Sequence, residues 1–142
     1  MSSFKIKKKP RIGKAHGNKV YVVIGEDIAM KEEVEKEKEE INTMDDDMNT
    51  PLHLACMNGD IKVVSALIDK GAHVNIHNGF DQYTPLHLAC MNGHLKVAMY
   101  LIEMGAKINA RDSDKSTPLH IACNNKKTEV VLALIENGAM IN

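Results

Sequence analysis

Three copies of one heptapeptide decide the fold of this chain, and the first reads Thr50-Pro51-Leu52-His53-Leu54-Ala55-Cys56. The segment returns unchanged over residues 84–90 and, with Ile in place of the second Leu, over residues 117–123. The two intervals are 34 and 33 residues, and a repeat at this period is typical of a helical solenoid. One unit of a solenoid cannot bury its apolar face alone, so the repetition predicts a stack of units.

The heptapeptide and the segments that close each unit resemble the ankyrin-repeat family. Thr-Pro-Leu-His is the ankyrin pattern, and Gly-Ala-x-Val/Ile-Asn follows it over residues 71–75, 105–109 and 138–142. The resemblance covers roughly residues 45–142. It implies an all-α ankyrin-repeat solenoid of stacked helix-turn-helix units joined by hairpin-like turns. It also implies a scaffold that binds other proteins.

When the chain is aligned to this family pattern, the repeats occupy residues 45–77, 78–111 and 112–142. Ile41-Asn42 precedes Thr50 by the interval at which Ile108-Asn109 precedes Thr117. We therefore expect residues 20–44 to form a degenerate N-terminal capping unit with an acidic helix. A free acidic helix or a disordered linker is the alternative. Residues 1–19 are expected to be a basic, disordered arm.

Each repeat is predicted to contain two short helices. Thr50 is placed to cap the first helix, and Pro51 begins it, where the missing N–H has no intrahelical acceptor to lose. Apolar residues then recur at i, i+3 and i+4, and Gly59 ends the helix. A second amphipathic helix follows from about residue 60. Helices this short are marginal alone, so each depends on its neighbours.

Departures from the family pattern affect the turns and the last repeat. Met48, Gln82 and Lys115 stand where the family usually has glycine, which weakens the prediction of a tight turn. Residues 78–83 contain one extra residue, so this turn should bulge. Lys126 replaces the glycine between helices, and we expect the adjacent Asn124-Asn125 to supply the left-handed position instead.

The end of the last repeat is expected to be incompletely covered, because no polar capping unit follows it. The apolar side chains concerned are Val131, Leu134 and Ile135. We favour the explanation that the chain is a fragment of a longer protein or is simply a short protein. The alternative is that a partner covers that end.

Charge is segregated along the chain, although the net charge is only −1. Residues 1–20 carry seven basic side chains and no acid, whereas residues 26–47 carry eleven acids against three lysines. The basic run over residues 5–11 could serve nuclear import, contact nucleic acid or pair with the acidic segment. The longest apolar runs, over residues 97–102 and 130–135, have six residues each, far short of the roughly 20 that span a bilayer. We expect a cytoplasmic protein, with a nuclear one as the alternative, and no membrane partner.

Metal and catalytic sites are not predicted. His53, His87 and His120 each precede a cysteine by three residues, and both residue types bind zinc. However, a solenoid spaces equivalent residues by about 10 Å, one helix-packing distance, whereas zinc needs its ligands at one point. In ankyrin repeats this histidine bonds the backbone of the adjacent unit, and three copies in one context give no distinctive nucleophile. We expect no enzyme, metal or cofactor.

A binding surface is the stronger prediction. The resemblance places it on the concave face formed by turn tips and first helices. Phe80 and Tyr83 lie on a turn where polar residues are expected, and exposed aromatic and Met side chains are enriched at interface hot spots. The predicted partner-binding residues are Phe80, Tyr83, Met57 and Met91 at the apolar centre, with Asp46, Asp47 and Arg111 at the rim. Local packing of Phe80 or Tyr83 is the alternative. We expect a monomer that binds a protein, with nucleic acid as a weaker alternative.

Overall fold

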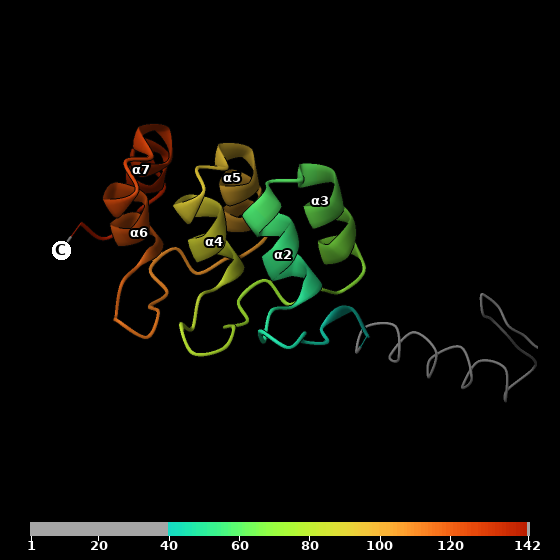
Figure 1. The fold of residues 1–142 in the computed structure, drawn as a ribbon. Coiled ribbons are helices and arrows are strands. Elements are labelled where there is room, and N and C mark those ends of the chain that lie inside the picture. Colours follow the sequence, from blue (N-terminus) through green and yellow to red (C-terminus); the bar gives the residue numbers. More distant parts are fainter. Residues whose placement is uncertain (1–39, 142) are drawn as a thin grey trace, which may run out of the picture. The chain divides into compact units, whose positions relative to one another are not determined.

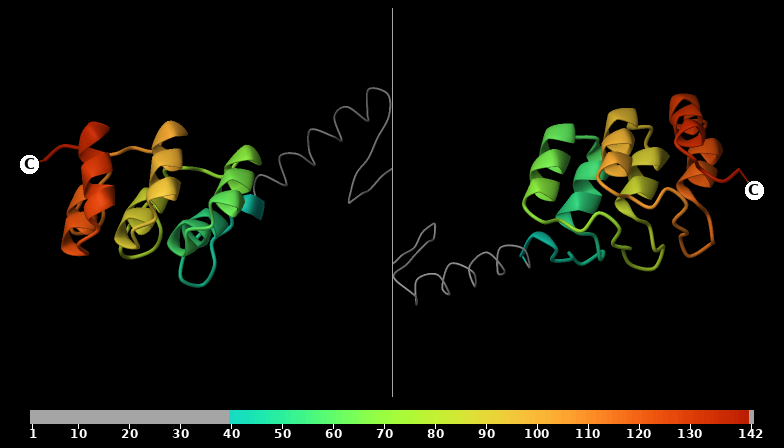
Figure 2. Two further views of the ribbon diagram at one scale, coloured as in Figure 1. Left: turned by 90° about the horizontal axis from the view of Figure 1, so that it is seen from above. Right: turned by 180° about the vertical axis from the view of Figure 1, so that it is seen from behind.

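The computed structural model describes residues 40–141, and helices are the regular elements of this part of the chain. Six helices follow in three pairs: α2 (Pro51–Asn58) with α3 (Ile61–Asp69), α4 (Pro85–Met91) with α5 (Leu95–Glu103), and α6 (Pro118–Asn124) with α7 (Thr128–Glu136). The first helices α2, α4 and α6 pack in one layer, the second helices α3, α5 and α7 in another (Figures 1 and 2). The turns that precede each first helix lie along one edge of the stack (Figure 1). The predicted all-α stack is confirmed.

Each first helix begins with the same capping arrangement. The Thr50 hydroxyl accepts the His53 N–H, and the Thr50 N–H donates to Nδ1 of His53 at 3.1 Å. This reciprocal pattern satisfies two backbone N–H groups that have no partner inside the helix. Thr84 with His87 and Thr117 with His120 repeat it. The heptapeptide therefore determines where every first helix begins.

The turns adopt the left-handed conformation without glycine. Met48, Gln82 and Lys115 have φ of 62°, 57° and 65°. A left-handed backbone costs an L-residue roughly 1–2 kcal/mol, and hydrogen bonds within each turn offset this cost. The absence of glycine therefore does not prevent the turn, contrary to the doubt raised by the sequence.

The left-handed residue between the helices of the third repeat is Lys126, at φ 59°. Gly59 and Gly93 fill the equivalent positions of the other repeats, at φ 76° and 73°. Asn125 has φ −98°, so the expectation that the asparagines would take over the left-handed position is wrong. The position is fixed by the chain path into the next helix, and the residue there must accept it.

The core runs through all three repeats as rows of equivalent side chains. Leu52, Leu86 and Leu119 form one row and are buried. Leu134 is also buried, contrary to the prediction that it would be partly uncovered, because the two layers of its own repeat enclose it. Val131 is half-buried and Ile135 is exposed, as expected. Burying a leucine side chain stabilises the fold by about 1.5–3 kcal/mol.

Asparagine side chains connect successive repeats on the side of the closing segments. Asn75 donates to the Gly105 carbonyl at 3.1 Å and accepts the Lys107 N–H at 2.8 Å. Asn42 makes the same pair of bonds to the Gly71 carbonyl and the His73 N–H. Residues 41 and 42 thus stack on the first repeat as the end of a preceding unit would. The basic arm and most of the expected capping unit lie outside the described residues.

Candidate partner-binding groove

The turns of the first and third repeats are closed by an aspartate side chain. One carboxylate oxygen of Asp45 accepts the N–H groups of Asp47 and Asn49, at 3.0 and 2.8 Å. Asp112 accepts the N–H groups of Asp114 and Ser116 in the same way. In these four-residue turns the carboxylates of Asp45 and Asp112 are engaged by backbone.

The turn of the second repeat is built differently. Its closing hydrogen bond runs from the Asn78 N–H to the Tyr83 carbonyl, one residue further than the bond from Asp45 to Asn49. The Asn78 side chain accepts the Tyr83 N–H at 2.7 Å and donates to the Asn49 side chain of the preceding turn at 2.8 Å. The extra residue forms the predicted bulge and holds Phe80 away from the stack, with 96% of its surface exposed.

Successive turns are also joined by main-chain contact. The Ser113 N–H donates to the Asp81 carbonyl at 2.9 Å. Together with the Asn78–Asn49 bond, this contact fixes the three turns side by side. The side chains at their tips are therefore positioned relative to one another by the fold.

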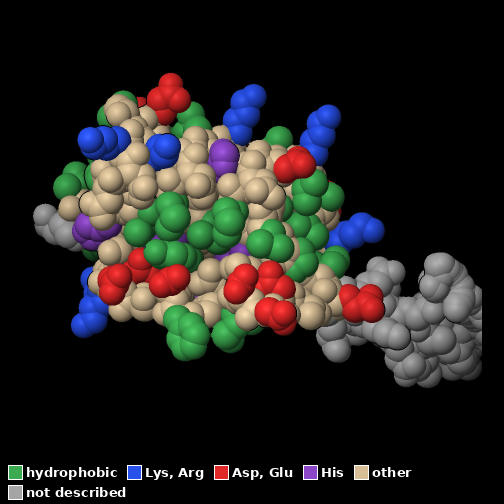
Figure 3. Space-filling model, in the orientation of Figure 1, with side chains coloured by type: hydrophobic (Ala, Val, Ile, Leu, Met, Phe, Trp, Pro, Cys, Tyr) green, Lys and Arg blue, Asp and Glu red, His purple; other side chains and the backbone are tan. Residues whose placement is uncertain are grey.

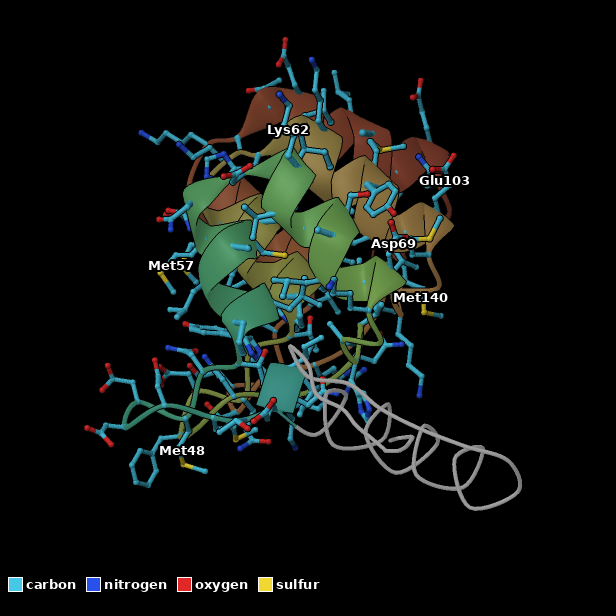
Figure 4. The ribbon with its side chains drawn as sticks, turned by 90° about the vertical axis from the view of Figure 1, so that its right-hand side faces the viewer. Met48, Met57, Lys62, Asp69, Glu103 and Met140 are labelled. Carbon is cyan, nitrogen blue, oxygen red and sulfur yellow. The ribbon has the colours of Figure 1, made fainter. Side chains whose placement is uncertain are left out.

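A groove lies between the turns and the first helices of the first two repeats, and we call it the turn groove. Its volume is about 510 Å³. The lining residues are Asp46, Asp47, Met48, Asn49, Met57, Asn78, Gly79, Phe80, Asp81, Tyr83, Leu88 and Met91. Figure 3 shows hydrophobic side chains gathered over this face, with acidic side chains in a row along the turns. Met48 and Met57 lie on one side of the molecule, and Asp69 and Glu103 lie on the other (Figure 4).

Six of the seven residues predicted from the sequence line the turn groove: Asp46, Asp47, Met57, Phe80, Tyr83 and Met91. Arg111 is exposed but is not among the lining residues. The two aromatic residues differ. Tyr83 is half-buried beside His87, with ring centroids 5.9 Å apart, whereas Phe80 stands free in solvent. The alternative of local packing therefore describes Tyr83 in part and Phe80 not at all.

The sequence reasoning missed Leu88 and Met48. Leu88 is the fifth residue of the heptapeptide, and it lies off the stripe at i, i+3 and i+4 that faces the core. It is buried at the base of the turn groove, whereas its counterpart Leu54 is 40% exposed. An apolar residue at this position in all three copies was the available signal. Met48 occupies the left-handed turn position, where apolar side chains are not expected.

The histidines of the first two heptapeptides join neighbouring repeats. Nδ1 of His53 accepts from Thr50, so the neutral ring carries its proton on Nε2, which donates to the carbonyls of Ile76 and Tyr83 at 3.1 and 3.0 Å. Nε2 of His87 donates likewise to the Ser116 carbonyl at 2.9 Å. Burial lowers the pKa of both His53 and His87. Both rings are therefore neutral hydrogen-bonding groups of the stack.

The cysteines of the first two heptapeptides are buried thiols. Burial raises the pKa of Cys56 and of Cys90 to about 12, so neither forms a thiolate near neutral pH. A thiolate is the species that attacks carbon or binds metal. In residues 40–141, no three His, Cys, Asp or Glu side chains are arranged to hold a metal ion.

A second groove of about 540 Å³ lies along the second helices. Its lining includes Ile61, Leu95, Tyr100 and a residue of each charge, Lys96 and Glu103. It contains none of the predicted site residues. The turn groove differs because it combines side chains from turns and helices of two repeats.

The geometry defines a class of protein, a helical repeat protein with an exposed groove beside its turns. The family model described as ankyrin repeats (3 copies) matches residues 21–112 and again residues 71–142. The chain belongs to the ankyrin-repeat family. Members of this family are generally protein–protein interaction modules and typically noncatalytic. No curated protein matches the chain in sequence. Within the described residues, no helix is both long and apolar enough to cross a bilayer.

Proposed function

We propose that this chain is a noncatalytic scaffold or adaptor that binds a protein partner on the concave face, in the turn groove. The observation that carries the proposal is the convergence of Met57, Leu88 and Met91 from two first helices with Phe80 and Tyr83 from one turn. An exposed apolar cluster with a polar rim is the usual anatomy of an interface. Methionine adapts its shape to a partner at small cost.

Phe80 supports the proposal most directly. A side chain that is 96% exposed contributes almost nothing to burial of the core. The bulge that presents it is held by four hydrogen bonds of Asn78. A rigid aromatic side chain presented in this way can bury its whole surface on a partner at little entropic cost.

The test is an affinity capture with the full chain as bait. Proteins retained by the wild type are quantified beside those retained by a Phe80→Ala/Tyr83→Ala variant. The matched control is Met104→Ala/Leu132→Ala, which removes two exposed apolar side chains from the second-helix side. We expect at least one partner to be lost by the groove variant and retained by the control. Retention of every partner by the groove variant, with its melting temperature unchanged, would exclude the turn groove as the binding site.

A second candidate function rests on the seven basic residues in positions 1–20. In this proposal the protein is a nuclear regulator whose basic arm contacts nucleic acid while the repeats bind a protein. These residues lie outside the described part of the chain. A salt-dependent mobility shift that disappears on deletion of residues 1–14 would support it. Binding to nucleic acid that survives the deletion would contradict it.

A further inference from the structure

The turn groove has a one-sided charge. Three aspartates are among its twelve lining residues, Asp46, Asp47 and Asp81, and none of the twelve is Lys, Arg or His. Over the described residues 40–141 the chain carries twelve acidic and eight basic side chains, a much smaller relative excess of acid. The groove lining is therefore more one-sided in charge than the described part of the chain as a whole.

The carboxylates at the groove do not take part in the hydrogen bonds that close the turns. Asp45 and Asp112 use theirs to close their turns. In contrast, Asp47 and Asp81 contribute backbone atoms to the turn hydrogen bonds, and their side chains are exposed. Asp46 is exposed as well. These three carboxylates can therefore accept hydrogen bonds from a ligand.

The third turn adds Asp112 and Asp114 near this groove, and its Lys115 carries the opposite charge. The bond between Ser113 and Asp81 brings Asp112 and Asp114 close to the second turn. Burial, followed by the charges of Asp81, Asp112 and Asp114, raises the pKa of the Tyr83 phenol. The phenol thus lies within the field of three aspartates, on the wall of the groove.

The base of the turn groove is apolar. Leu88 is buried there, Met57 and Met91 are half-buried above it, and Phe80 and Met48 project beyond, the latter 47% exposed. Acidic polymers and nucleic acids would be repelled by the rim. An uncharged apolar helix would leave the aspartates facing its surface without partners.

We propose that the turn groove binds an extended segment of a partner protein in which a bulky apolar residue is flanked by arginine or lysine. This inference rests on the proposed function and names the chemistry of its ligand. The apolar residue fills the space above Leu88, between Met57 and Met91. The flanking cations pair with Asp46, Asp47 and Asp81, and one of them stacks on the free face of Phe80. Arginine suits these positions because its stem covers apolar surface while its guanidinium bonds carboxylates.

The experiment uses the full chain and three fluorescein-labelled peptides of equal length. The first is Gly-Arg-Leu-Arg-Phe-Arg-Leu-Arg-Gly. The second has Glu in place of every Arg, and the third has Ser in place of Leu and Phe. Fluorescence anisotropy is measured at 20 and at 500 mM salt. We expect the first peptide to bind, the acidic peptide not to bind, and the serine peptide to bind at least tenfold more weakly. High salt should weaken binding of the first peptide, because exposed charge pairs are screened.

Two triple variants locate the site. Asp46→Asn/Asp47→Asn/Asp81→Asn removes three groove charges and should lower the affinity for the first peptide about tenfold. The loss is limited to this size because exposed ion pairs are individually weak. Asp69→Asn/Glu103→Gln/Glu136→Gln removes the same charge from the second helices, and less than a twofold change is expected. Equal losses in the two variants, or no loss in the first, would overturn the inference.

The outcomes separate this inference from the proposed function. If the acidic or the serine peptide binds best and Phe80→Ala/Tyr83→Ala abolishes that binding, the groove is a binding site with another specificity, and the charge inference is wrong. If neither any peptide nor any captured protein depends on Phe80 and Tyr83, the proposed function itself fails. If Lys7→Gln/Lys8→Gln/Lys9→Gln strengthens binding of the first peptide at 500 mM salt, where the change in net charge is screened, the chain's own basic arm competes for the groove, and assignment of the groove to a partner is overturned.

Discussion

The three heptapeptides and the three turns before them make opposite use of repetition. The heptapeptides are almost identical, and each buries its leucine at position three and caps its helix with the same Thr–His pair. The turns share a left-handed residue, but the second differs from the other two in length and closing side chain, and all three differ in their tip residues. The core-facing residues of the heptapeptides encode stacking and do not distinguish one repeat from another, although the outward-facing Leu54 and Leu88 already differ in burial. The turns, which contact fewer neighbours, carry the differences.

The largest expected effect separates the two regions by stability. Leu86→Ala truncates a side chain that is 1% exposed in the middle repeat and should cost about 2–5 kcal/mol of unfolding free energy. Phe80→Ala in the turn should stay within about 0.5 kcal/mol, because it removes no buried contact. Urea denaturation followed by circular dichroism measures both. Comparable losses in the two variants would show that the turn is part of the core.

A smaller effect is expected at the glycine that ends α2. Gly59 has φ 76°, and a Cβ there would collide with the ring of His94, whose Nε2 lies 2.9 Å from the Met57 carbonyl. Gly59→Ala should cost at least the roughly 1–2 kcal/mol of a left-handed L-residue. Gly105→Ala is the matched control, because φ is 99° there and nothing lies near the added atom. The difference between the two unfolding free energies isolates the clash, and a larger loss at Gly105 would contradict it.

The third repeat offers the reverse change. Lys126 holds φ 59° where the other repeats have glycine, so Lys126→Gly should raise the unfolding free energy by up to about 1 kcal/mol. The relief of strain exceeds the entropy that glycine adds to the unfolded chain. Asn125→Gly, at φ −98°, should give no gain. A higher melting temperature for Asn125→Gly than for Lys126→Gly would indicate that Asn125, not Lys126, holds the left-handed position.

The smallest effect near neutrality concerns the histidines of the heptapeptide. Burial lowers the pKa of His53 and His87 below the ordinary histidine value of about 6.5, so the unfolded chain binds more protons than the folded one below that pH. Stability is fully present above about pH 6.5 and falls as the pH drops from there through the folded pKa values. Chemical denaturation between pH 8 and 5 should show this slope. If the imidazole resonances of His53 and His87 titrate above the unfolded pKa, the sign of the pKa shift and of the predicted pH dependence is wrong.

Much of the fold could be predicted from the sequence because the signals are local. Thr50, Pro51 and Gly59 define one helix within ten residues of chain, and the 33- and 34-residue intervals transfer that reading to the other repeats. Lys126 shows the limit of local reasoning. Asparagine tolerates a left-handed backbone better than lysine, yet the position is set by the path between two packed helices, and lysine occupies it.

The sequence by itself determined the repeat and the starts of the first helices. It also singled out Phe80 and Tyr83, the two aromatic residues of a turn where polar residues are expected, which lie at the candidate groove. The tertiary structure decided which of these side chains meet. It brought Asp81 and Leu88 together with Met57, excluded Arg111 from the lining, and left Phe80 exposed while Tyr83 packs beside His87. The physical reason is that capping and periodicity act within one helix, whereas burial at the turns depends on atoms supplied by the neighbouring repeat.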